Sequence, residues 1–89
     1  MSTSELTVTD RVREVEITDE MLSVTLADGR TISVPLEWYP RLLRASPEER
    51  ANWEIAGAGF GIHWPDVDED LSVEGLLRGA KAPDALDRR

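Results

Sequence analysis

Four carboxylates stand within five residues near the C-terminal end of this chain, at Asp66, Asp68, Glu69 and Asp70. With Ser72, the three aspartates have the alternating oxygen spacing of the first half of a calcium-binding loop. The rest of that loop is missing, because Leu71 replaces its central glycine and Leu77 replaces its final glutamate. We therefore expect the run to precede a helix, whose dipole favours negative charge. Binding of Ca²⁺ or Mg²⁺ is the alternative.

His63 is the only histidine, so a site built from several imidazoles is excluded. It alternates with apolar residues in a strand pattern that places the imidazole on the less buried face. No nucleophile motif accompanies it, so we expect a structural or surface histidine, with catalysis beside Asp66 or Asp68 as the alternative. The Gly-x-Gly-x-Gly of residues 57–61 lacks the spacing and following helix of a dinucleotide fingerprint. The sequence predicts no cofactor.

The composition is that of a small acidic domain. The 89 residues, enough for one core, carry a formal net charge of −8. This charge repels nucleic-acid phosphates, and no stripe of Lys or Arg offsets it, so a basic protein is a better partner than DNA or RNA. No apolar run reaches the roughly 20 residues of a membrane span. Cysteine is absent and residues 1–5 lack signal-peptide features, which together favour the cytoplasm.

Apolar and polar residues alternate over three segments, which predicts strands at 12–18, 22–27 and 32–36. Residues 1–10 before them are polar and aperiodic, and predict a flexible N-terminal arm. A three-residue loop at 27–29 keeps the apolar residues of the last two strands on one face, and places Gly29 in a left-handed conformation. Its predicted pairs are Leu26 with Arg30, Val24 with Ile32 and Leu22 with Val34. Pro35, which cannot donate to a ladder, ends the third strand.

Two short helices are predicted in the middle of the chain. Apolar residues at helical spacing favour a broken helix over 36–45, with Pro40 in a first turn. The segment Ser46-Pro47-Glu48-Glu49 is a capping box that begins a second helix over about 47–52.

The apolar residues occupy odd-numbered positions in 53–55 and even-numbered positions in 60–64, so the alternation changes phase between the two segments. A tight hairpin turn around Gly57-Ala58 explains the change, and a bulge at Gly59 within one strand is the alternative. The predicted hairpin pairs are Ile55 with Phe60 and Trp53 with Ile62.

Ser72 is predicted to cap a last helix that ends at Gly79. The expected buried face of this helix consists of Val73, Leu76 and Leu77. Residues 80–89 are predicted to be a disordered tail. Residues 11–79 then form a single α+β domain, with a small, mainly antiparallel sheet of three N-terminal strands and a C-terminal hairpin, and short helices between and after them.

The chain contains three tryptophans, Trp38, Trp53 and Trp64. In so small a domain most of this aromatic area belongs to the core, but a tryptophan on a rim beside charges would anchor an interface. Trp64 adjoins the acidic run, so the predicted partner contacts are Trp64, Asp66, Asp68 and Asp70.

Several segments resemble a known family: Asp28-Gly29, Val34-Pro35-Leu36, Tyr39-Pro40-Arg41-Leu42, Ser46-Pro47-Glu48-Glu49-Arg50 and His63-Trp64-Pro65-x-x-Asp68-Glu69-Asp70. They are similar to segments of small bacterial proteins labelled domain of unknown function 2442, over about residues 12–79. The resemblance implies a small α+β domain with no established activity and no assigned catalytic residue. Some members carry a helix-turn-helix domain, and many are encoded beside another small protein, which suggests a toxin–antitoxin-like pair.

The leading hypothesis is a non-enzymatic cytoplasmic interaction module, the acidic, antitoxin-like partner of a small basic protein. One alternative is a small metal-dependent or His/Asp-based enzyme site that uses His63 with Asp66 or Asp68. Another is a transcription accessory domain that binds a repressor rather than DNA. An exposed strand edge would also allow homo-oligomers.

Overall fold

Two antiparallel sheets form the framework of the fold, and the computed structural model describes residues 6–82 of the chain. The first sheet, in the order β1-β2-β3, consists of β1 (Val12–Ile17), β2 (Met21–Leu26) and β3 (Thr31–Pro35). The second, in the order β4-β5-β6, consists of β4 (Glu54–Ala56), β5 (Gly61–Trp64) and β6 (Glu69–Ser72). The α-helices are α1 (Pro40–Leu43), α2 (Pro47–Ala51) and α3 (Val73–Arg78). The 3-10 turns are η1 (Val8–Asp10), η2 (Leu36–Trp38) and η3 (Gly57–Gly59).

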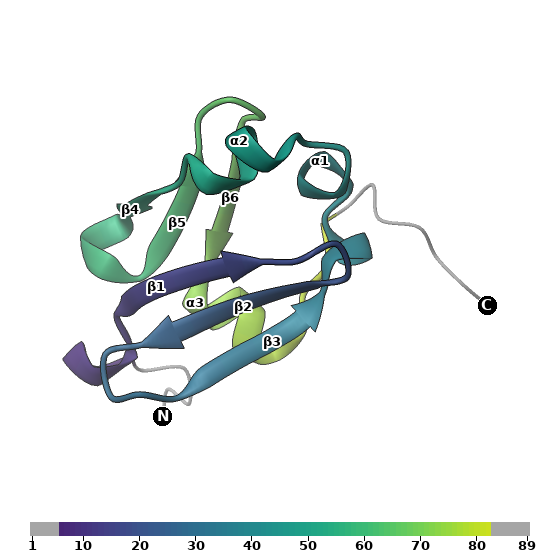
Figure 1. Cartoon of the computed structure of the whole chain (residues 1–89). Helices are drawn as coiled ribbons and strands as arrows, with labels where there is room; N and C mark the ends of the chain where they lie inside the picture. Colours follow the sequence, from purple (N-terminus) through teal and green to yellow (C-terminus); the bar gives the residue numbers. More distant parts are fainter. Residues whose placement is uncertain (1–5, 83–89) are drawn as a thin grey trace.

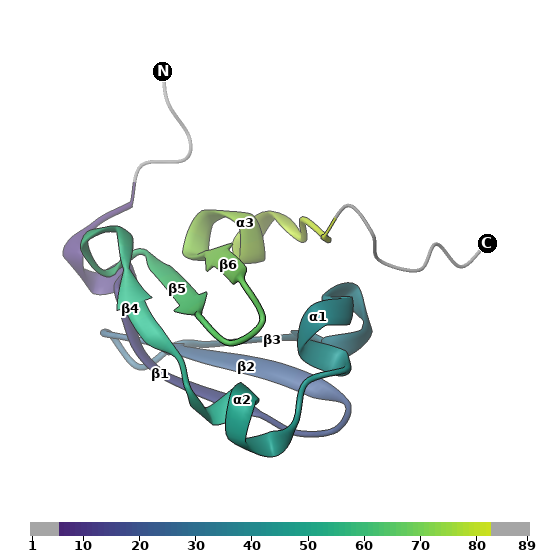
Figure 2. The ribbon, with the colours of Figure 1, turned by 90° about the horizontal axis from the view of Figure 1, so that it is seen from above.

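The two sheets lie in separate layers. Viewed from above in Figure 2, β1, β2 and β3 form one layer, while β5, β6 and α3 lie in the other. In Figure 1, α1 and α2 lie along the top, beyond β1. The core fills the space between the layers, and its fully buried side chains include Leu22, Val24, Leu26, Leu36, Leu42, Ile62, Trp64 and Val73.

The first sheet has the predicted register. The pairs are Leu26 with Arg30, Val24 with Ile32 and Leu22 with Val34, which confirms the three-residue loop. Gly29 in this loop has φ of 97°, a conformation that a residue without Cβ adopts without strain. Pro35 is the last residue of β3. In β1, the pairing shifts between Val12 and Glu14, and this bulge allows Val12 and Val15 to be buried together despite their odd spacing.

The middle helices also agree with the sequence. The Ser46 hydroxyl accepts a hydrogen bond from the Glu49 N–H at 3.1 Å, and the Glu49 carboxylate accepts one from the Ser46 N–H at 2.9 Å, so the capping box is confirmed. The predicted broken helix is found as η2 followed by α1, with Pro40 as the first residue of α1. Among residues 6–82, no helix has the length and hydropathy needed to cross a membrane.

The second sheet corrects the sequence analysis in two places. Residues 69–72 form a strand, β6, so the acidic run does not lead directly into a helix, and the hairpin belongs to a separate three-stranded sheet. The β4–β5 turn occurs where it is predicted, but its register is wrong, because Ile55 pairs with Ile62 and not with Phe60. The loop is wider than a tight turn: it contains η3, in which Ala58 has φ of 59°, and then Phe60.

The last helix has the predicted caps, since the Ser72 hydroxyl accepts from the Gly75 N–H at 2.9 Å and Gly79 is left-handed with φ of 75°. The prediction of the buried face of α3 is only partly correct. Val73 and Leu76 are buried, but Leu77 is 49% exposed, because the core covers only the side of α3 that carries the first two residues.

Part of the predicted N-terminal arm is tied to the first sheet. The Asp10 carboxylate accepts a hydrogen bond from the Thr7 N–H at 2.8 Å and forms an ion pair with Arg30. These contacts hold the pKa of the Asp10 carboxyl below its usual range, with the Thr7 hydrogen bond as the largest cause. The remainder of the arm, residues 1–5, lies outside the described residues.

Candidate functional site

The β5–β6 hairpin gives the acidic run its shape. Trp64 at the end of β5 lies opposite Glu69 at the start of β6, so residues 65–68 are the connecting loop. Pro65 begins the loop, where the missing N–H costs no ladder bond. Asp68 ends the loop with φ of 55°, a left-handed conformation that aspartate tolerates better than most residues. The Trp-Pro-x-x-Asp-Glu-Asp motif therefore specifies a hairpin and holds its charges at the tip.

The predicted aspartates Asp66, Asp68 and Asp70 are all exposed. The Asn52 side-chain amide donates to a carboxylate oxygen of Asp66 at 3.0 Å. Arg41 donates from Nη1 to the backbone carbonyl of Asp68 at 2.6 Å, and so braces the loop. Neither contact is an ion pair with a carboxylate, so the loop presents its negative charge to solvent.

A row of charged side chains crosses the outer face of the second sheet. His63 on β5 lies opposite Asp70 on β6 and opposite Glu54 on β4. His63 Nδ1 is 2.7 Å from a carboxylate oxygen of Asp70, and the two side chains are 30% and 72% exposed. His63 thus lies on the less buried face, as predicted. Glu54 was not a candidate, because only the observed register places it beside His63. We define the acidic surface as Glu54, Asp66, Asp68 and Asp70.

The prediction that Trp64 contacts a partner is wrong. Its side chain is 0% exposed, and its indole N–H donates to the Arg50 carbonyl at 3.0 Å. The alternation that places Ile62 and Trp64 on one face already directed the indole inwards, and this signal outweighs its proximity to charges in the sequence. Trp64 anchors the second sheet to the core.

The described residues do not form a metal site. Within residues 6–82, no group of three or more His, Cys, Asp or Glu side chains could hold a metal ion. The calcium-loop interpretation fails because residues 69–72 are an extended strand, whereas such a loop must wrap around its cation.

A pocket of about 220 Å³ lies on the other side of β6, between this strand, α3 and the segment 80–82. Tyr39 lines the pocket and is almost fully buried, and its hydroxyl donates to the Ala80 carbonyl at 2.9 Å. Burial, and secondarily the negative charge of Glu69, raise the pKa of the Tyr39 hydroxyl. Tyr39 therefore remains a hydrogen-bond donor that holds residue 80. The rest of the predicted tail, residues 83–89, lies outside the described residues.

The comparisons with known proteins concern the same folded region. The family model described as "Protein of unknown function (DUF2442)" matches residues 12–82. No curated protein matches the chain.

Two solved structures are similar. The crystal structure of a protein of unknown function from Rhodospirillum rubrum is 31% identical, with a TM-score of 0.69, and the match covers 84% of this chain and 93% of that one. The solution structure of an uncharacterized protein from Chromobacterium violaceum is 25% identical, with a TM-score of 0.70, and the match covers 83% of this chain and 70% of that one.

Proposed function

The chain belongs to the DUF2442 family of proteins of unknown function, and we propose that it is a non-enzymatic module that binds a basic protein through its acidic surface. One observation carries this proposal. Within residues 6–82, none of the four carboxylates of the acidic surface forms an ion pair with Lys or Arg. Strand pairing and a hairpin loop hold these charges in place, yet they face solvent.

This arrangement suits recognition of a cationic surface. Side chains on a paired strand are already oriented, so little conformational freedom is lost when a partner binds. The net charge of −8 adds a long-range field that attracts a basic protein and raises the rate of encounter. Arg41 donates to the backbone carbonyl of Asp68 and not to a carboxylate of the acidic surface, so it forms no ion pair there.

The surroundings of His63 argue against catalysis as the main function. The His63–Asp70 pair lies on an open strand face, and the pocket behind β6 is lined by Asp70 but not by His63. Acid–base catalysis benefits from a site that holds the substrate and excludes water. An imidazole outside the cavity lacks that environment.

The family resemblance supports a more specific form of the proposal. In a toxin–antitoxin-like pair, this chain would be the acidic, antitoxin-like member, and the basic partner would be the product of an adjacent gene. We place the complex in the cytoplasm, a compartment that suits a chain without cysteine.

Co-expression of the chain with the product of the adjacent gene tests the proposal. We expect the two proteins to purify as a complex at low ionic strength. The affinity should fall as salt is added, because salt screens exposed charges over roughly 10 Å at 0.1 M. Recovery of this chain alone at both low and high salt would contradict the proposal.

A second function is favoured by one specific contact, the 2.7 Å separation of His63 Nδ1 and Asp70, which is the geometry of an oriented general base. Thermal unfolding with added Ca²⁺, Mg²⁺ or Zn²⁺ tests the metal-dependent form of this second function, because a ligand that binds the native state raises its stability. A melting temperature that rises with metal in the wild type but not in His63→Ala would favour the enzyme. An unchanged melting temperature would contradict the metal-dependent form.

A further inference from the structure

The outer edge of β1 is unpaired within residues 6–82. β1 stands at the end of its sheet, and among the described residues it pairs only with β2. The Thr18 N–H donates to the Met21 carbonyl at 2.9 Å. Because hydrogen-bonded pairs alternate along antiparallel strands, Val15 and Ile17 direct their backbone N–H and C=O groups away from β2. Within residues 6–82, these outward groups have no hydrogen-bond partner.

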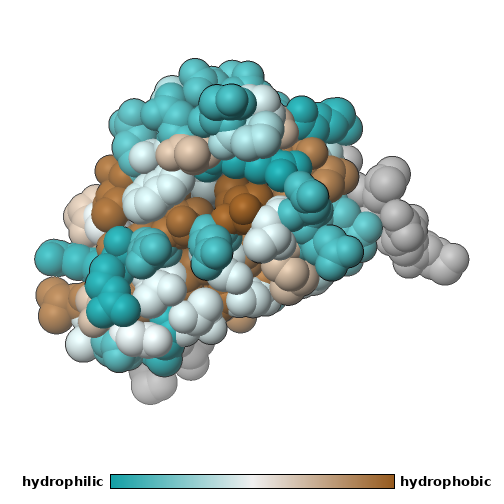
Figure 3. Space-filling model, viewed as in Figure 1, coloured by the Kyte–Doolittle hydropathy of each residue, from teal (hydrophilic) through white to brown (hydrophobic). Residues whose placement is uncertain are grey.

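A groove of about 340 Å³ runs beside this edge, between β1 and α2. Its apolar walls are Val15, Ile17, Pro47, Ala51 and Trp53. Figure 3, in the view of Figure 1, shows hydrophobic residues in a band between hydrophilic regions above and below. A strand added to β1 would direct alternate side chains towards this groove and the others over the outer face of the sheet.

The outward side chains along this edge are acidic. Glu14 and Glu16 are exposed, and the Asp19 side chain just beyond them is 99% exposed. Arg50 lines the groove, but its guanidinium already bonds to Asp19 and to two backbone carbonyl groups. Residues opposite the glutamates would therefore meet negative charge.

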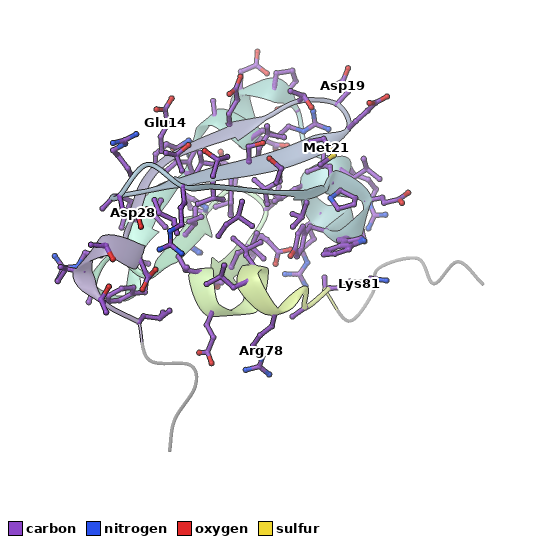
Figure 4. The ribbon with its side chains drawn as sticks, turned by 90° about the horizontal axis from the view of Figure 1, so that it is seen from below. Glu14, Asp19, Met21, Asp28, Arg78 and Lys81 are labelled. Carbon is purple, nitrogen blue, oxygen red and sulfur yellow. The ribbon has the colours of Figure 1, made fainter. Side chains whose placement is uncertain are left out.

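Two of the described basic side chains, Arg78 and Lys81, lie away from this edge. Figure 4 shows Glu14 and Asp19 pointing away from one side, whereas Arg78 and Lys81 lie on the opposite side, from which Arg78 points away. Arg13 is the basic residue of β1, and it occupies the bulge that precedes the open segment. The edge is thus electrostatically complementary to a cationic strand.

A second copy of this chain would fit the edge poorly. A two-fold axis would pair β1 with its copy in antiparallel fashion. Registers centred on Glu16 or on Val15 would place Glu16 opposite Glu16, or Glu14 opposite Glu16. Like charges directly opposite each other destabilise a strand pair, whereas Lys or Arg at those positions would stabilise it.

We infer that the β1 edge accepts a β-strand from a basic partner protein, in which Lys or Arg alternates with apolar residues. The apolar residues enter the groove and hydrogen bond to Val15 and Ile17, and the basic residues pair with Glu14 and Glu16. The inference rests on the proposed function, and it adds the chemistry of the partner and a contact separate from the acidic surface.

The test titrates the full chain with a blocked peptide, Lys-Val-Lys-Leu-Lys-Val-Lys, and follows the Val15 and Ile17 amide signals by NMR. Two N-methylated peptides serve as matched probes. Methyl groups on the Val and Leu amides remove the donors that face β1, whereas methyl groups on the Lys amides remove only those on the far edge. We expect the first peptide to bind about tenfold more weakly than the unmodified one and the second to bind about as well, since hydrogen bonds to β1 are lost only in the first.

Two variants complete the test. Glu14→Lys/Glu16→Lys changes exposed side chains, and it should shift the preference to the peptide Glu-Val-Glu-Leu-Glu-Val-Glu. Asp66→Asn/Asp70→Asn should leave binding of the basic peptide unchanged. Equal affinities for the two methylated peptides, no binding to the wild type, or self-association through β1 would overturn the inference. Loss of peptide binding only in Asp66→Asn/Asp70→Asn would also overturn it, but would leave the proposed function intact.

Discussion

The two sheets have the same meander topology, but the outer face of β2 and β3 differs from the outer face of the second sheet. The strands of the first sheet have 6, 6 and 5 residues, and those of the second have only 3, 4 and 4. On β2 and β3 the outer face is neutral, with hydroxyl pairs at 2.8 Å for Ser23 and Ser33 and 3.2 Å for Thr25 and Thr31. On the second sheet the corresponding face carries Glu54, His63 and Asp70.

This difference suggests a division of roles. The longer strands of the first sheet supply six of the thirteen buried core residues, compared with two from the second sheet, and they need no charge on β2 or β3 to do so. Strands as short as those of the second sheet are marginal by themselves, so they depend on the core through Ile62 and Trp64. Once anchored, the exposed carboxylates on their outer face can present charge to a partner.

The largest expected effect on stability comes from removing the Trp64 side chain, which holds the second sheet to the core. Trp64→Ala removes a fully buried side chain and its hydrogen bond to the Arg50 carbonyl. We expect it to lower the free energy of unfolding by about 3–5 kcal/mol, measured by urea denaturation. Asp70→Asn, on the exposed side of the same sheet, should change it by no more than about 0.5 kcal/mol. Similar values for the two variants would show that the second sheet does not depend on the core through Trp64.

A matched pair of glycines compares the loops of the two sheets. Gly29 and Gly59 have φ of 97° and 98°, so alanine is strained at both positions. Among residues 6–82, a Cβ at Gly29 would meet nothing within 4 Å, but at Gly59 it would lie 2.9 Å from Arg11 Cγ and Cδ. Arg11 would then have to move from its position 5.8 Å from the Phe60 ring centre.

We expect each alanine variant to lose about 1 kcal/mol of unfolding free energy from the left-handed conformation, with a further loss of about 0.5 kcal/mol in Gly59→Ala from the cation–π contact. Thermal or urea unfolding of both variants provides the measurement. A larger loss in Gly29→Ala would mean that Arg11 adapts without cost.

The smallest predicted effect concerns pH and the first sheet. The lowered pKa of Asp10 means that folding favours its carboxylate form. The resulting stabilisation is complete above the usual pKa range of aspartate, and is lost as the pH falls through the lowered pKa. Asp10→Asn lacks this contribution, so the difference in unfolding free energy between wild type and variant should be largest near neutral pH and shrink in acid. A difference that grows in acid would contradict the sign of the pKa shift.

The sequence was most informative where the determinants are local. Strict alternation, with glycine at position 29, specified the β2–β3 register, because a shift of one residue would expose every apolar side chain. The capping box at Ser46 likewise depends on residues within one turn. These signals hold regardless of what packs against the segment.

The strands and register of the second sheet could not be predicted from local sequence patterns alone. β6 begins with Glu69 and Asp70 and contains one large apolar residue, Leu71, so its composition favours a loop. The β4–β5 register required the wider loop in which Ala58 adopts a positive φ, a conformation unusual for alanine. Without that register, Glu54 could not be placed beside His63.

The central claim is that the acidic surface of the second sheet contacts the basic partner, and affinity for the purified partner tests it most directly. Asp66→Asn/Asp70→Asn and the control Glu20→Gln/Asp28→Asn each remove two exposed charges, the second pair from loops of the first sheet. We predict that the first variant raises Kd roughly tenfold and the control less than about twofold, as expected when one pair contacts the partner and the other acts only at long range. Equal increases in Kd would contradict the account, because they would mean that only the net charge matters.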